Sequence, residues 1–140
     1  RINMASEAIG ANAIFSGPNK GLSIIGDYCY AYSGNVIINN TTTDLLTFNT
    51  GKNILVVKMY WYGDFGYIGG AKVITEFVQF NGNSVYDNSR LINSSSGDGS
   101  NEYGDPTPFI IPPFTLVNVQ LGNDNAGDIE YGVNLVGKVY

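Results

Sequence analysis

The feature that most constrains the fold is an alternation of apolar and polar side chains with a period of two. It is clearest in three segments, residues 72–80, 114–121 and 128–140. A period of two places alternate side chains on opposite faces of a strand, whereas a helix repeats near every 3.6 residues. Each segment therefore predicts a strand with an apolar inner face. In the first, Glu76 shares its face with Ile74, Val78 and Phe80.

Five further segments are rich in β-branched or aromatic residues and are bounded by Gly, Asn, Asp or Pro, as strands usually are. They are residues 27–33, 35–39, 44–49, 53–62 and 83–92. We therefore expect eight to nine strands in total. A helical turn fits only residues 4–13, where Gly10 weakens it, so the N-terminus is predicted to be an arm or a single turn.

Strands at this spacing in a chain of 140 residues predict one all-β domain built from packed sheets. The best fit is a jelly-roll β-sandwich of about eight strands over residues 16–140, preceded by an N-terminal arm, residues 1–15. The Gly-, Ser- and Asn-rich linkers around residues 64–70 and 93–108 are the expected crossings between sheets. An immunoglobulin-like sandwich and a lipocalin-type barrel are the alternatives.

A pair of prolines precedes one of the best strands, in the stretch FIIPPFTLVNVQL, residues 109–121. Proline donates no hydrogen bond to a sheet, so Pro112 and Pro113 cannot lie in a central strand. They are expected to fix an extended lead-in that turns the chain into the strand at 114–121. With Pro106 and Pro108 they stiffen the whole segment, which predicts a well-defined crossing between sheets.

Charge is scarce in this chain. Charged residues make up 14% of it, against roughly 25% in an ordinary soluble domain. Such weakly charged polar surfaces occur on adhesins, carbohydrate binders and virion proteins. The net charge is −5 and the seven Lys and Arg residues are scattered singly, which provides no basic stripe for nucleic acid.

Targeting is not decided by these residues, and no membrane span is expected. No apolar stretch reaches the roughly 18–20 residues of a membrane span, and the first residues lack the layout of a signal peptide. The single Cys29 excludes a disulfide within the chain and is expected to be buried on the inner face of a strand.

The chain resembles small jelly-roll virion proteins of tailed phages, which decorate or cement capsids and recur in marine phage sequences. The resemblance spans residues 28–140 and rests on three stretches, YAYSGNVIINNTTTDLLTFNTGKNILVVK, FIIPPFTLVNVQL and GVNLVGKVY. It implies a structural protein on the capsid surface that forms a homotrimer and packs on the lattice of the major capsid protein. It carries no binding residues over to this chain.

The sequence offers few residues that could form a catalytic site. The chain contains no His, which removes Ser-His and Cys-His pairs and the common zinc sites. Only a pair of carboxylates could act, as in glycosidases, and Glu76 with Asp64 or Asp87 is the pair to test. We interpret these residues as solvated groups on an outer face, so no catalytic residue is predicted and the chain is not expected to be an enzyme.

Two acidic loops have the oxygen-rich composition that calcium prefers. One is residues 93–108, with Asp98, Asn101, Glu102 and Asp105; the other is residues 122–130, with Asp124, Asn125 and Asp128. Neither follows the helix-loop-helix calcium pattern, and Asp, Asn and Gly are also what turns require. Both are therefore interpreted as turns, and no metal or cofactor is expected.

Tyrosines are the most distinctive side chains. Tyr28, Tyr30 and Tyr32 lie on one face of a strand. Tyr60 and Tyr62 lie on one face of another strand, and Trp61 lies on its opposite face. Such rings serve in cores, in protein interfaces and in sugar-binding platforms. These five tyrosines are the candidate interface. Two functions stay open, a self-associating structural virion protein and a carbohydrate-binding or adhesive, receptor-binding module.

Overall fold

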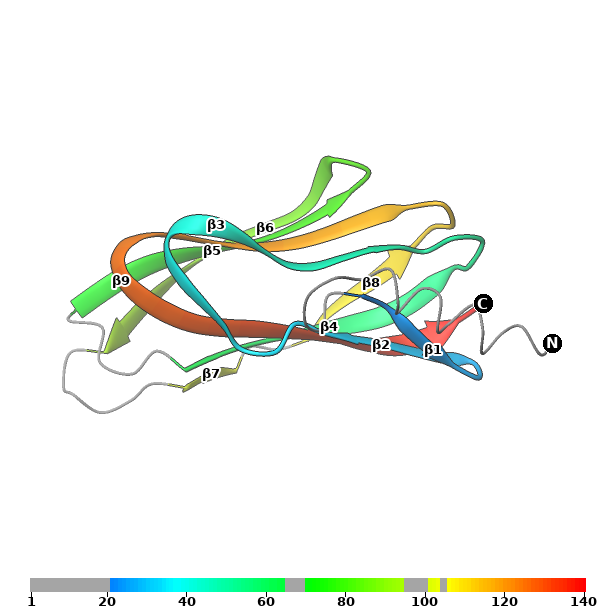
Figure 1. Cartoon of the computed structure of the whole chain (residues 1–140), viewed down its shortest axis with the longest axis horizontal. Helices are drawn as coiled ribbons and strands as arrows, with labels where there is room; N and C mark the ends of the chain where they lie inside the picture. The colour runs from blue at the N-terminus through cyan, green and yellow to red at the C-terminus, as the bar shows by residue number, and fades with distance from the viewer. Residues whose placement is uncertain (1–20, 65–69, 95–100, 104–105) are drawn as a thin grey trace.

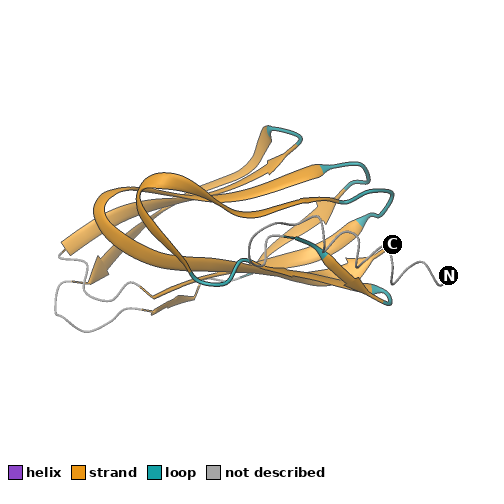
Figure 2. Cartoon of the chain, in the orientation of Figure 1, coloured by secondary structure: helices purple, strands orange, loops and turns teal. Residues whose placement is uncertain are grey.

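The computed structural model describes residues 21–64, 70–94, 101–103 and 106–140, and all its regular elements there are strands (Figures 1 and 2). The predicted arm, residues 1–15, lies outside the described residues. The strands are β1 (Ser23–Ile25), β2 (Tyr28–Tyr32), β3 (Val36–Asn49), β4 (Leu55–Asp64), β5 (Gly70–Phe80), β6 (Asn83–Ser94), β7 (Asn101–Tyr103), β8 (Thr107–Ile111) and β9 (Leu116–Val139).

The strands form two layers that share β9. In the layer we call the β4 layer, the order is β2, the second half of β9, β4 and β8, with β1 beside β2 and β7 beside β4. In the β5 layer, the order is the second half of β3, the first half of β9, β5 and β6. Two four-stranded antiparallel orders connected in this way are a jelly roll. The predicted all-β jelly-roll sandwich is therefore confirmed.

Strand β9 is one bent strand of 24 residues, where the sequence predicted two strands and a turn. Figure 1 shows it leaving the β5 layer, curving at one end of the molecule and returning through the β4 layer. The interpretation of residues 122–130 as a turn is thus wrong. Odd-numbered side chains point inward on both sides of the bend, including Val117, Leu121, Ile129 and Leu135, because the alternation is not interrupted.

Strand β3 also merges two predicted strands, and it follows β9 around the bend through two irregularities in the pairing. The first lies between Asn39 and Thr41, where Asn40 adopts a φ of 45°, a value that Asn tolerates better than most residues. The second lies between Asp44 and Leu46 and makes Leu45 the extra residue of a bulge. Leu45 and Leu46 are both fully buried, so the bulge adds apolar volume to the core.

The proline crossing is confirmed at residues 112–115. Strand β8 belongs to the β4 layer and β9 begins in the β5 layer, so the prolines stand where the chain changes layers. The buried Thr50 fixes this crossing: its hydroxyl donates to the carbonyl of Pro112 at 2.9 Å and accepts from the amide of Thr115 at 3.0 Å.

The residues before the proline pair, predicted as an extended lead-in, form the paired strand β8. Pro108 is accommodated opposite Lys58 because β8 pairs only with β4 among the described strands, and a strand at a sheet edge needs no donor on its outer side.

Candidate functional site

An exposed sheet surface gathers four of the five candidate tyrosines. It is the outer face of the β4 layer, and the strand registers place its side chains in three rows across the strands. We call it the tyrosine face. Its members are Ile25, Tyr28, Lys138, Val56 and Ile110 in the first row, Ser23, Tyr30, Val136, Lys58 and Pro108 in the second, and Tyr32, Asn134 and Tyr60 in the third.

The tyrosine face exposes large apolar side chains to an unusual degree. Tyr28 is 60% exposed, Ile110 71% and Tyr60 38%, and Ile25, Val56 and Val136 are exposed beside them. Contiguous apolar patches of this kind mark sites of interaction in soluble proteins. Lys58 and Lys138 supply the positive charge on this face, and no carboxylate is among the residues of its three rows.

The tyrosines of β2 line a hollow of about 500 Å³ together with Val136, Gly137 and Lys138. The rings of Tyr30 and Tyr32 pack with their centroids 5.0 Å apart. The ammonium of Lys138 lies 5.6 Å from the centroid of the Tyr28 ring, a favourable cation–π distance. The tyrosines are thereby held in place before any partner arrives.

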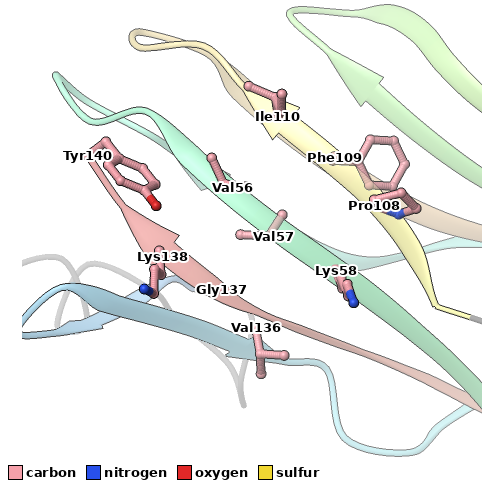
Figure 3. A pocket seen from close by; sticks show the side chains of 10 residues that line it. All are labelled: Val56, Val57, Lys58, Pro108, Phe109, Ile110, Val136, Gly137, Lys138 and Tyr140. Atoms are coloured by element: carbon pink, nitrogen blue, oxygen red, sulfur yellow. The ribbon is translucent and has the colours of Figure 1, made fainter.

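A second hollow, of about 680 Å³, adjoins the first across Gly137 and Lys138. Figure 3 shows Val56, Ile110 and Tyr140 around it, with Lys138 and Lys58 also on its border. Apart from the two lysines and the hydroxyl of Tyr140, its side chains are hydrocarbon. This hollow therefore suits an apolar group that carries negative charge beside it.

Tyr62, the fifth predicted residue, is more enclosed than the other four. Its ring covers Gly132, where an added Cβ would lie 2.6 Å from the phenol carbon and oxygen. Burial raises the pKa of Tyr62, and a hydrogen bond with Ser33 partly offsets that rise. Tyr62 thus packs against its own chain, while Tyr28, Tyr32 and Tyr60 are open to a partner.

The interpretation of Glu76 as a solvated residue on an outer face is wrong. Its side chain is on the inner face of β5, and the residue is 1% exposed. It accepts hydrogen bonds from Tyr131 Oη at 2.6 Å and from Asn88 Nδ2 at 3.1 Å, and it pairs with Arg90 at 3.3 Å. The alternation had placed Glu76 on the inner face, and these three partners are what make its burial tolerable.

The proposed carboxylate pair is not assembled. Asp87 lies opposite Phe77 on β5, so it faces outward while Glu76 faces the core. The structure does not describe the side chains of the remaining candidates, which are Asp64, Asp98, Asn101, Glu102, Asp105, Asp124 and Asn125. Among the side chains that are described, no group of three His, Cys, Asp or Glu is placed to hold a metal ion.

Cys29 is buried on the inner side of β2, and burial raises the pKa of its thiol from an ordinary 9.0 to about 11. A raised pKa means that the protonated thiol stabilises the fold fully below pH 9 and that this contribution is lost as the pH rises towards 11.

We expect a thiol reagent at pH 8 to modify Cys29 only after unfolding in urea. We also expect Cys29→Ala to flatten the decline of stability between pH 9 and 11. Rapid labelling of the folded chain would contradict this placement.

Phe114 is a feature that the sequence did not reveal. It is 73% exposed and adopts a φ of 55°, which is unfavourable for a bulky side chain. The other two described non-Gly residues with positive φ are Asn40 and Asn81. Alternation placed Phe114 as the first residue of a strand, and no local motif signals a left-handed backbone at this position.

The strain at Phe114 predicts an inverted order of two substitutions. Alanine normally stabilises a chain relative to glycine by about 0.4–1 kcal/mol, because it restricts the unfolded state. At a φ of 55° we expect Phe114→Gly to be the more stable variant instead, by about 1 kcal/mol. The reason is that a positive φ raises the free energy of residues with a Cβ, whereas glycine adopts it without strain. Urea unfolding of the two variants measures this, and the usual order would show that Phe114 is unstrained.

The chain was compared with known families, curated proteins and solved structures. No family model matches it, and no curated protein does. Two solved structures of infectious bursal disease virus are similar, the virus-derived T=1 particle (13% identity, TM-score 0.47) and the VP2 subviral particle (14% identity, TM-score 0.44). Each covers 79% of this chain, which spans about a third of the viral chains, 31% and 32%.

A third solved structure, dimeric latent PorU from Porphyromonas gingivalis, has 12% identity and a TM-score of 0.39, and covers 89% of this chain and 14% of its own. The described residues include no helix long and apolar enough to cross a membrane. We therefore base the functional proposal on the chain's own surface.

Proposed function

We propose that this chain is a non-enzymatic structural protein of a virus particle, a decoration or cement protein on the capsid surface of a bacteriophage. It associates with itself as a homotrimer through the tyrosine face and packs on the lattice of the major capsid protein. The observation that carries the proposal is the tyrosine face, five strands wide, with exposed rings and aliphatic side chains around two hollows. The phage assignment and the threefold rest on the sequence resemblance.

Self-association follows from the physical properties of this face. Water in contact with such a patch is costly, and a partner that covers it recovers roughly 25 cal/mol for each Å² of apolar surface. Closed symmetry covers the patch on every copy without producing fibres. The absence of His from the sequence and the enclosure of Glu76 by its three partners support a role without catalysis.

The predicted arm, residues 1–15, has a place in this proposal. An arm that precedes a compact sandwich can reach a neighbouring copy and add contacts outside the tyrosine face. We propose that the arm is protected from proteolysis only in the assembly. Limited digestion should therefore remove residues 1–15 below the association concentration and leave them intact above it.

Tyr60→Ser and Tyr28→Ser test the proposal directly. Each removes an exposed ring from the tyrosine face and leaves the core unchanged, so we expect weaker assembly, by at least tenfold in dissociation constant, with an unaltered β-rich spectrum. Sedimentation velocity over a concentration series measures this. Ile37→Ser is the matched control, because Ile37 is at least as exposed as either tyrosine but pairs with β9 toward its bend, outside the tyrosine face. Equal effects of all three substitutions would refute an interface centred on the tyrosines.

Carbohydrate binding is the second candidate, favoured by one observation. Tyr28, Tyr30 and Tyr32 surround a hollow, and Asn134 lies opposite Tyr32 as a neighbouring hydrogen-bonding group. Rings beside polar groups are the usual form of a sugar platform. A glycan array hit that disappears in Tyr28→Ser, on a chain that remains monomeric, would support this function over the first.

A further inference from the structure

Phe114 forms a fixed apolar projection at the crossing between the layers. Its amide donates to the carbonyl of Gly51, and the next amide, of Thr115, donates to Thr50 Oγ1 at 3.0 Å. The amide of Leu116 in turn donates to Asn81 Oδ1 at 2.8 Å. Three consecutive amides are thus bonded, so the backbone holds the strained φ and presents a largely exposed phenyl ring to solvent.

Strain and exposure together call for an explanation outside the fold of a single copy. An exposed ring contributes little to the stability of the chain, and a bulky residue with positive φ costs free energy. The observed conformation directs a ring outward from a rigid base, which is the arrangement of an anchor residue in an interface.

The same chain carries a receptor for such a ring. The hollow of about 680 Å³ is lined by hydrocarbon from Val56, Ile110 and Val136, and is large enough for a phenyl group with its neighbours (Figure 3). Phe114 is not among the residues that line it. The ring of one copy therefore does not occupy its own hollow.

We propose that Phe114 of one copy inserts into this hollow of a second copy. The contact is heterologous, because it joins two different patches, and a heterologous contact made once by each copy is what a closed threefold requires. The inference rests on the proposed self-association and specifies which parts of the two copies meet.

Charge supports the same arrangement. Lys58 and Lys138 border the hollow, whereas the outer face of the β5 layer carries Asp44 and Asp87 farther along the strands from Phe114. The exposed Lys52, which follows Gly51, is a positive charge on the Phe114 side. Packing two tyrosine faces together would bring lysines toward lysines without a carboxylate from either face. Packing the Phe114 side of one copy on the tyrosine face of the next supplies two carboxylates, Asp44 and Asp87, against one further lysine, Lys52.

A mixing experiment with two variants tests this contact. Phe114→Gly removes the ring and suits the positive φ, and Val136→Trp fills the hollow from an exposed position. We expect each variant alone to be monomeric at concentrations where the unchanged chain assembles. Their equimolar mixture should form a one-to-one dimer and nothing larger, because one intact ring and one intact hollow remain. Phe114→Asn, which also tolerates positive φ, serves as a second ring-less variant, and thermal unfolding establishes that each variant is folded.

Three results separate the possible failures. If the unchanged chain is itself monomeric, the proposed function fails and this contact fails with it. If the unchanged chain assembles and both variants still assemble as it does, the contact is wrong while self-association stands. If the variants are monomeric but their mixture forms no dimer, the ring and the hollow do not meet and the inference is overturned.

Discussion

Glu76→Ala is expected to lower the free energy of unfolding by about 3–5 kcal/mol, the range for removing one partner of a buried charge pair. The carboxylate links both layers, because Glu76 and Arg90 lie on β5 and β6 while Tyr131 lies on the returning half of β9. Arg90 also donates to Tyr131 Oη at 2.8 Å. Without the carboxylate, the buried hydroxyl of Tyr131 and the half-buried amide of Asn88 lose an acceptor, and the guanidinium of Arg90 loses the charge of Glu76.

The graded variants around Glu76 make this prediction specific. Tyr131→Phe removes the hydroxyl that donates to Glu76 and accepts from Arg90, but it leaves the ion pair of Glu76 and Arg90 in place. It should therefore cost less, about 1.5–3 kcal/mol, the range for a hydrogen bond to a charged group. Asp87→Ala, on the outward face of the same sheet, should change stability by less than about 0.5 kcal/mol. Urea unfolding followed by tryptophan fluorescence measures all three. A loss below 1 kcal/mol for Glu76→Ala would mean that the carboxylate is solvated in solution.

Gly137→Ala is the second large effect, with an expected loss of about 3 kcal/mol, the upper range for overpacking. A Cβ at this position would collide with the carbonyl oxygen of Val56 and would lie 2.6 Å from the Cα of Val57. These are backbone atoms of the neighbouring strand β4, so relief requires the strands themselves to move apart. Gly137 also lines both hollows, so the same change should weaken assembly.

Gly122→Ala is the control for Gly137→Ala. Its added Cβ would lie 3.3 Å from side-chain atoms of Phe77 and Thr42, which can shift by a few tenths of an ångström. Its loss should therefore be well below that of Gly137→Ala under the same urea titration. Equal losses at the two positions would show that the close approach of β4 to β9 at Gly137 is absent.

The alternation of side chains predicted most of the fold, because it reports which face of each strand meets the core. It separated Trp61 from Tyr60 and Tyr62, and it placed Val117 and Leu135 inward, as the structure confirms. It did not show that residues 122–130 continue a strand, since Gly, Asn and Asp suit a turn as well as a bend. Continuity depends on pairing with β3, which lies about 85 residues earlier.

The sequence predicted part of the candidate site, the faces of the strands on which its tyrosines lie, but not which strands are neighbours. The five tyrosines could be assigned to faces of strands, but the strands that lie side by side are decided by pairing over long distances along the chain. Ile110 and Val136 join Tyr28 only through the register of β8, β4 and β9. Glu76 was misjudged for a related reason, because Arg90 and Tyr131, which make its burial possible, are 14 and 55 residues away.

The mass of the unmodified chain in solution tests the central claim most directly, that the tyrosine face is covered by another copy. Sedimentation equilibrium at tens of micromolar, in buffer of moderate ionic strength, should give three chain masses that fall to one on dilution. A single chain mass throughout this range, with Tyr28 and Tyr60 still accessible to a phenol-modifying reagent, would contradict the account.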